Sequence, residues 1–299
     1  MNISIKGDTA RGDVARESAM KEKNAPSRAF NRVAANVIMW LFSITCVYPV
    51  VWMIYSSLKT SKDFERNILG LPKAILFDNY VKIFSAGTIG VYMFNTVRNT
   101  AISLVFILLF GYINGYFISR YRFRGRGFLY TLYMLGMLVP MHALLIPIYI
   151  LFSNARLNNQ WFTVALPNIA FNLPMAIFLV EGFIATIPRD IDEAASIDCA
   201  SFSRTLFTII MPLTTPILVT VGIITFFNCW NEFSFSLVLL NNQKLFTLPL
   251  GLTMFKGVYQ SDYPKMMTTM VIAMMPALVL YFAFSKQIIL GMMSGALKG

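Results

Sequence analysis

The segment AISLVFILLFGYINGYFI, residues 101–118, decides the fold class, because it carries no charged side chain over its whole length. A helix that crosses the hydrocarbon core of a bilayer needs about 20 consecutive, mostly apolar residues. Gly111 and Gly115 have the small-xxx-small spacing of helices that pack closely in membranes, although this spacing also arises by chance. We therefore predict a transmembrane helix over Phe94–Ile118.

The composition of the whole chain agrees with a membrane protein. Of its 299 residues, 57% are hydrophobic and only 13% are charged, against about 25% charged in soluble domains. Five further segments are long and apolar enough to cross a bilayer: Val33–Tyr55, Phe128–Phe152, Phe162–Ile184, Leu213–Leu239 and Met266–Phe284. The predicted fold class is therefore an all-α, polytopic membrane protein with six transmembrane helices.

The net charge of +11 indicates how these helices are oriented, and we do not interpret it as a nucleic-acid site. Cytoplasmic segments of membrane proteins are enriched in Lys and Arg. With the N-terminus inside, 15 of the 25 basic residues lie in cytoplasmic parts and nine in external parts. The four arginines of RYRFRGR, residues 120–126, dominate this bias. We expect a multi-pass protein with both termini in the cytoplasm.

The chain divides by composition into a tail and a membrane domain. Residues 1–32 hold seven Lys or Arg and no apolar run, which is typical of a basic cytoplasmic tail. Residues 33–299 form the predicted six-span domain. Within it lie a polar segment, 187–212, and a predicted cytoplasmic C-terminal tail, 286–299.

No enzyme chemistry is visible in the motifs of this chain. The sequence contains no HExxH, GxSxG or Walker A motif, so we predict no catalytic residue. Three cysteines and a single histidine, His142, give neither a disulfide framework nor metal-ligand spacing. Few polar residues interrupt the spans, and no span carries a pair of acids, which weighs against a proton-coupled secondary carrier.

The segment IPRDIDEAASIDCASFSRTLFTIIMP, residues 187–212, is acidic in an otherwise basic chain. Asp190, Asp192 and Glu193 would lie in the first turn of a helix, where the helix dipole favours negative charge. Ser201 is a plausible N-cap for a second helix. We predict a helix, a turn and a second helix that Pro212 closes. An ordinary amphipathic loop resting on its own bundle is the alternative.

The spacing within this segment resembles the EAA loop of ABC-transporter permeases. Glu193, Ala194 and Ala195 match the acidic and small residues of that motif, and Ile209 and Pro212 match its I-x-L-P ending. Two positions depart from the pattern, since Cys199 replaces a glycine and Met211 replaces a leucine. We predict that Cys199 keeps a negative φ in a right-handed turn, because its Cβ atom makes a left-handed conformation less favourable than it is for glycine.

The resemblance covers most of the chain and is closest to the shorter permease of maltose-type sugar importers. CWNEFSFSLVLL, residues 229–240, is similar to the W-N-[DE]-F segment of sugar permeases, and GMMSGALKG, residues 291–299, is similar to their C-terminal ending. The resemblance implies a type I ABC-importer fold in a bacterial cell membrane. It also implies partners: a second homologous permease, two nucleotide-binding ATPase subunits and an extracytoplasmic solute-binding protein.

The resemblance further implies a role for the polar segment as a cytoplasmic coupling loop that docks on an ATPase subunit. The coupling residues it implies are Glu193, Ala194, Ala195, Asp198, Cys199 and Pro212. ATP and Mg would be bound by the partner ATPases, so no cofactor is expected in this chain. The implied function is import of a sugar or oligosaccharide. A permease for a non-sugar solute, a secondary carrier and a membrane scaffold or channel subunit are the alternatives.

A weaker pattern indicates a substrate pathway. Asn228, Trp230, Asn231 and Glu232 combine an aromatic face with hydrogen-bonding groups, which suit a sugar. The alternative is an interfacial tryptophan beside polar residues that satisfy a helix irregularity. Whether this chain or its partner permease holds the sugar stays open, as does the choice between a neutral and an acidic sugar.

Overall fold

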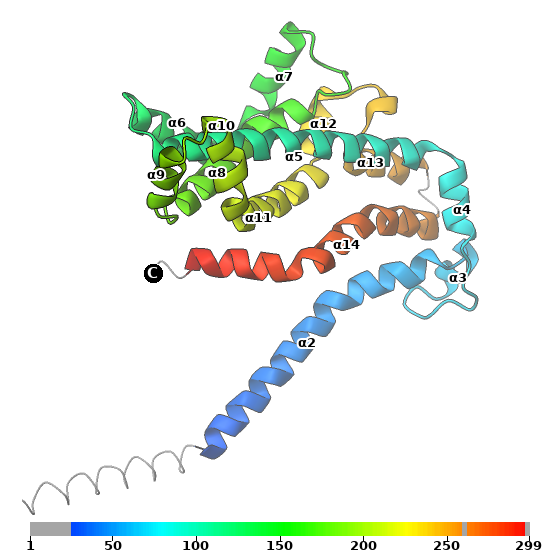
Figure 1. Ribbon diagram of the computed structural model, residues 1–299. Helices are drawn as coiled ribbons and strands as arrows, with labels where there is room; N and C mark the ends of the chain where they lie inside the picture. Colours follow the sequence, from blue (N-terminus) through cyan, green and yellow to red (C-terminus); the bar gives the residue numbers. More distant parts are fainter. Residues whose placement is uncertain (1–24, 259–261, 297–299) are drawn as a thin grey trace, which may run out of the picture. The chain divides into compact units, whose positions relative to one another are not determined.

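The computed structural model describes residues 25–258 and 262–296, which form helices and contain no β-strand (Figure 1). Residues 1–24 of the predicted basic tail and the last three residues of the predicted C-terminal tail lie outside the described residues. The chain divides between Tyr55 and Ser56 into two compact units. The helices are α2 (Ala25–Ser57), α3 (Ser61–Arg66), α4 (Asp78–Ser85), α5 (Thr88–Arg120), α6 (Arg126–Leu138), η1 (Met141–Leu144), α7 (Leu145–Asn154), α8 (Ala165–Ile184), α9 (Asp190–Ile197), α10 (Phe202–Arg204), η2 (Thr205–Ile210), α11 (Met211–Trp230), α12 (Ser234–Leu239), η3 (Gln243–Leu245), α13 (Leu248–Val258) and α14 (Tyr263–Ala296).

Within residues 25–258 and 262–296, five helical stretches are long and apolar enough to cross a membrane, and they overlap five of the six predicted spans. They are Arg32–Ser57, Thr88–Arg120, Ala165–Ile184, Phe202–Trp230 and Tyr263–Lys286. Their mean hydropathies lie between 1.4 and 2.1, so length and composition alone identify them. The prediction of a polytopic helical membrane protein is confirmed.

The predicted third span, Phe128–Phe152, is not one straight helix. It is split into α6 and the pair η1 and α7, which are bent by 92° at the break. Pro140 accounts for the break, because a proline restricts the preceding residue to extended backbone. Val139 has φ −77° and ψ 117°, which ends α6. Counted as one span, this bent pair raises the number of candidate spans among the described residues to six.

The predicted helix end at Pro212 is wrong, because the helical stretch that starts at Phe202 runs through it to Trp230. A proline inside an α-helix has no N–H, and its ring collides with the carbonyl four residues back. Here η2, immediately before it, is a π-helix. The N–H of Met211 bonds to the carbonyl of Leu206, five residues back, and this wider turn brings the backbone past the proline without a break.

The two glycines of the predicted packing motif lie where α5 crosses α8. A Cβ atom at Gly111 would lie 2.8 Å from the Cβ of Ala176, and one at Gly115 would lie 2.7 Å from Cγ1 of Val180. Both distances are too short for a real side chain. Small residues therefore let the two backbones approach, as the small-xxx-small spacing predicts.

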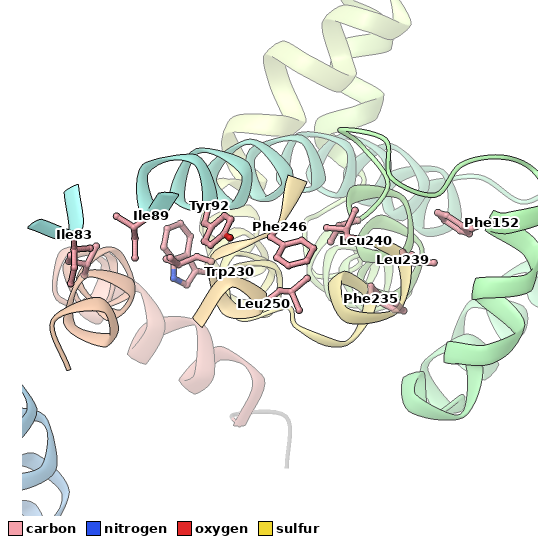
Figure 2. Close-up of a cluster of buried hydrophobic side chains, with 13 residues drawn as sticks. Ile83, Ile89, Tyr92, Phe152, Trp230, Phe235, Leu239, Leu240, Phe246 and Leu250 are labelled. Atoms are coloured by element: carbon pink, nitrogen blue, oxygen red, sulfur yellow. The ribbon is translucent and has the colours of Figure 1, made fainter. Parts of the chain in front are cut away.

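Two buried clusters make up the core of the second unit. One joins α5, α8, η2 and α11, and its buried residues are Ile107, Tyr112, Tyr116, Ala176, Val180, Ile184, Leu206, Ile210, Ile217, Val221 and Cys229. The other extends from the N-terminal part of α5 to α12 and Phe152 of α7, and Figure 2 shows its Tyr92, Trp230, Phe246 and Leu250 side chains. Beside this second cluster, the Asn95 side-chain amide donates to the backbone carbonyls of Lys244 and Phe246, at 2.9 and 3.0 Å.

We expect Gly115→Ala to lower the thermal melting temperature of the purified protein in detergent. Its new Cβ would force α5 and α8 apart, and overpacking of this kind costs about 1–3 kcal/mol. Gly182→Ala on α8 is the control, because a Cβ there meets nothing within 4 Å. Equal melting temperatures for the two variants would show that the close approach does not matter for stability.

Candidate functional site

The acidic segment, residues 187–212, folds as a short helix, a turn and a helix. Helix α9 begins at Asp190 and carries Asp190, Asp192 and Glu193 in its first turn, where the exposed N–H groups of the helix favour negative charge. The side chains of Glu193 and Ala194 are exposed, whereas Ala195 is buried within its own chain. Among the predicted coupling residues, Ala195 therefore packs inside the chain, whereas Glu193 and Ala194 form part of the surface.

The prediction that Cys199 keeps a negative φ is wrong. Its φ is +54°, in the left-handed region. Two hydrogen bonds explain this conformation: the N–H of Cys199 bonds to the carbonyl of Ser196 at 3.1 Å, and the N–H of Ala200 bonds to the carbonyl of Ala195 at 2.9 Å. This pair of bonds is the Schellman motif, which ends a helix and requires a left-handed residue at this position. The need for glycine-like geometry therefore remains although the residue is cysteine.

Ser201 starts the second helix, as predicted. Its hydroxyl oxygen accepts a hydrogen bond from the N–H of Arg204 at 3.4 Å, and its backbone is extended. Asp198 and Cys199, which form the turn between the helices, are both exposed. Hydrogen bonds therefore fix the turn at both ends, through the Schellman motif that ends α9 and the Ser201 cap that starts the second helix.

Three side chains on one face of α5 hold the acidic segment, and none of the three was predicted from the sequence. Tyr112, Tyr116 and Arg120 are spaced four residues apart, so they form a stripe along the helix. The Tyr112 hydroxyl donates to the carbonyl of Leu206 in η2 at 2.5 Å. The spacing Tyr-x3-Tyr-x3-Arg was a visible signal, but its partners lie far away in the sequence.

The carboxylate of Asp192 is the centre of this attachment. Its Oδ1 accepts a hydrogen bond from the Tyr116 hydroxyl at 2.9 Å, and its Oδ2 lies 3.0 Å from Nε of Arg120. The same arginine donates from Nη2 to the carbonyl of Ile187 at 3.0 Å. Because the Arg120 side chain is only 6% exposed, water screens this ion pair weakly. The first turn of α9 is thereby fixed to the end of α5.

The outward surface of α9 combines charge with one apolar side chain. Asp190, Glu193 and Asp198 are exposed, and Ile197 is 81% exposed. An isoleucine so exposed in a segment too polar for a bilayer leaves its apolar surface in water. This arrangement suits a protein partner that offers a basic surface and an apolar depression.

A second region of interest is a cavity of about 460 Å³ at the breaks in two spans. It lies between η1, α8 and the irregular backbone that separates α11 from α12. The residues that line it are Met141, His142, Asn168, Phe171, Asn172, Asn228, Asn231, Glu232, Phe233, Ser234 and Phe235. Non-helical backbone at membrane depth is tolerated where it lines such a cavity.

The structure separates the four predicted pathway residues. Asn228, Asn231 and Glu232 line the cavity, whereas Trp230 is 4% exposed in the cluster of Figure 2. The indole Nε1 of Trp230 donates to the carbonyl of Ala273 at 3.2 Å. The tryptophan therefore packs α11 against α14 and does not line this cavity.

Side chains from α8, α11, η1 and α12 meet inside the cavity. The Asn228 amide donates to Oδ1 of Asn172 at 2.8 Å, and the Asn172 amide donates to the carbonyl of Asn168, also at 2.8 Å. Nε2 of His142 lies 3.4 Å from the hydroxyl of Ser234. Asn168, Asn172, His142 and Ser234 were not among the predicted site residues. Within the described residues, no three His, Cys, Asp or Glu side chains are placed to hold a metal ion.

Comparison with known proteins places these features in a family context. The family model described as "Binding-protein-dependent transport system inner membrane component" matches residues 107–290, which include the acidic segment and the cavity residues. The chain is 30% identical to "Probable ABC transporter permease protein YurM" of Bacillus subtilis (strain 168), over 98% of each chain. It is also 30% identical to "Trehalose/maltose transport system permease protein MalG" of Thermococcus litoralis, over 87% of this chain and 94% of that protein.

The fold is similar to that of a solved membrane transporter. A chain in the crystal structure of a bacterial ABC transporter involved in the import of the acidic polysaccharide alginate aligns with a TM-score of 0.76. The alignment covers 87% of this chain and 96% of that chain, at 22% sequence identity. At this identity the similarity supports the fold alone.

We expect Cys199→Gly to stabilise the turn of the acidic segment. Glycine adopts a left-handed φ without the penalty of about 1–2 kcal/mol that a Cβ imposes, and its extra backbone entropy offsets about half of that gain. Thermal melting in detergent should therefore show a small rise. Cys199→Ala, which removes the thiol and keeps the Cβ, should show none. A rise in both variants would assign the effect to the thiol.

Asp192→Asn should release the first turn of α9 from α5. The change removes the charge that faces Arg120, and hydrogen bonds to charged groups contribute about 1.5–3 kcal/mol. Hydrogen exchange of the α9 amides should become about tenfold faster or more. Asp190→Asn is the matched control, since that carboxylate is exposed in the same turn. Equal exchange in both variants would contradict the attachment.

Proposed function

The chain belongs to the family of binding-protein-dependent transport system inner membrane components, and we propose that this ABC-transporter permease imports a sugar or an oligosaccharide. A permease of this family is a non-enzymatic membrane subunit. The relative named for trehalose and maltose transport supports the choice of a sugar. The cavity supports it as well, because it combines amide and hydroxyl groups with aromatic side chains.

The acidic segment is the surface proposed to receive the ATPase. The observation that carries this proposal is the exposure of Ile197 and Glu193 on a helix that Asp192 fixes to α5. A surface that transmits force must be accessible on one side and anchored on the other. Helix α9 meets both requirements, since its exposed acids face outward and its anchoring acid faces Arg120.

The remaining subunits of the importer are part of the same proposal, and they fit the family. Two ATPase subunits bind ATP and Mg, a second homologous permease completes the membrane path, and an extracytoplasmic solute-binding protein delivers the sugar. The family description, which names binding-protein-dependent transport, supports the solute-binding protein as a partner. The family description supports a location in the inner membrane of a bacterial cell. The distribution of Lys and Arg supports an orientation with both termini, and the acidic segment, in the cytoplasm.

Variants of the exposed α9 residues test the coupling role. We expect Ile197→Ser and Glu193→Lys to weaken association with the ATPase, because the first removes apolar contact and the second reverses a charge at the interface. ATP hydrolysis stimulated by sugar-loaded binding protein should fall at least tenfold for the reconstituted transporter. Co-purification with the ATPase should fall in parallel.

Ile75→Ser is the control for that experiment, because Ile75 is 68% exposed and lies outside the acidic segment. Its ATP hydrolysis and subunit assembly should match the wild type. If both α9 variants assembled and hydrolysed ATP normally, the acidic segment would not be the ATPase contact. The assignment of the chain to its family would be unaffected.

A further inference from the structure

We propose that the cavity lined by Asn168, Asn172, Asn228, Asn231 and Phe233 is a binding subsite in this chain for one unit of a neutral sugar. The inference rests on the proposed function and goes beyond it in two respects. It assigns a substrate contact to this subunit, and it selects an uncharged sugar over an acidic one. Four features of the cavity support it.

The first feature is that backbone N–H groups at the break between α11 and α12 have hydrogen-bond partners without the asparagines. Glu232 satisfies the backbone there, since its Oε1 accepts the N–H of Phe235 at 2.5 Å, and its Oε2 accepts the N–H and the hydroxyl of Ser236 at 3.2 and 2.8 Å. Asn228 instead bonds across to Asn172 on α8. The asparagines of the cavity are therefore not explained by the irregular backbone.

The second feature is an unpaired donor. Asn168 is only 3% exposed, it lines the cavity, and its Nδ2 is buried without a hydrogen-bond partner among the described residues. Leaving a buried amide unpaired costs free energy unless a ligand or water satisfies it. A hydroxyl of a bound sugar is an acceptor of the right kind. Asn172, whose amide is held by its neighbours, sets the orientation of the polar wall.

The third feature is size and shape. A volume of about 460 Å³ lies within the range of about 300–1,000 Å³ that small-molecule sites occupy. Phe171 and Phe233 line the same space, so apolar ring faces stand beside amide groups. A pyranose or furanose ring presents C–H groups on its faces and hydroxyls on its edge, which matches this division.

The fourth feature is charge. Among the described residues that line the cavity, none is a lysine or an arginine, and the one carboxylate, Glu232, is held by three donors of its own chain. A uronic acid bound here would meet no lysine or arginine to neutralise its carboxylate, and a buried charge that is left unpaired is unfavourable. A neutral sugar needs only hydrogen bonds. The charge of this lining thus favours neutral over acidic sugars.

The test uses the assembled transporter with its ATPase and binding protein in proteoliposomes. Uptake driven by ATP is measured for radiolabelled maltotriose and arabinotriose as neutral probes and for trigalacturonate as the acidic probe. We expect the wild type to import a neutral probe. Asn168→Leu, which keeps the volume and removes the amide, should lower that uptake by about 3–10-fold at sub-saturating sugar, the effect of one lost hydrogen bond.

Stability separates a binding role from a structural one. Since its Nδ2 is unpaired, replacing Asn168 by Leu should leave the melting temperature unchanged or raise it. Asn231→Leu is a second variant, because the Asn231 side chain is exposed and its loss disturbs no buried contact. Asn114→Leu is the matched control on α5: its amide donates to its own helix at Phe110, and its uptake should equal the wild type.

The outcomes are distinct. The subsite is refuted if Asn168→Leu and Asn231→Leu import the neutral probe at the wild-type rate, if the loss of uptake follows a loss of melting temperature, or if the wild type imports only trigalacturonate. In each of these cases ATP-driven uptake still occurs, so the proposed importer function stands. If the wild type imports no probe, the proposed sugar import fails and the subsite fails with it.

Discussion

The contact between α5 and α8 at Gly111 and Gly115 is the constraint on which both functional regions depend. The side chain of Val180 fills the space that a Cβ at Gly115 would need, so the two helices have one close spacing and little freedom to slide. One of these helices holds the acidic segment through Arg120, and the other presents Asn168 to the cavity. Two regions far apart in the molecule are thus built on one tightly packed pair.

Hydropathy predicted the spans because lipid leaves the backbone few choices, but it did not predict where a span bends. Pro174, Pro216 and Pro276 lie inside continuous helices. Pro140 instead lies at a break, where the chain bends by 92° between α6 and the pair η1 and α7. Proline removes one hydrogen bond in every case. Whether a bend follows depends on whether neighbouring helices or π turns provide new partners for the freed backbone groups. Those partners are set by the tertiary structure and cannot be read from the local sequence.

The acidic segment was predictable in outline, and its details were not. The helix, the turn and the Ser201 cap follow from local sequence, because their partners are at most a few residues away. The residue type does not predict the left-handed Cys199, because the hydrogen bonds that end α9 outweigh the preference of cysteine for a negative φ. The Tyr116 and Arg120 contacts to Asp192 were missed because they join residues that only the fold brings together.

The π turn before Pro212 has a mechanical consequence. Because the helix does not stop there, residues 202–230 form one continuous body about 43 Å long, at about 1.5 Å per residue. A rotation of about 5° around one end of such a body displaces the other end by about 4 Å, which is more than a hydrogen-bond length. The far end of this lever carries Asn228, whose amide bridges to Asn172. A tilt of this helix at the acidic segment would therefore displace Asn228 relative to Asn172.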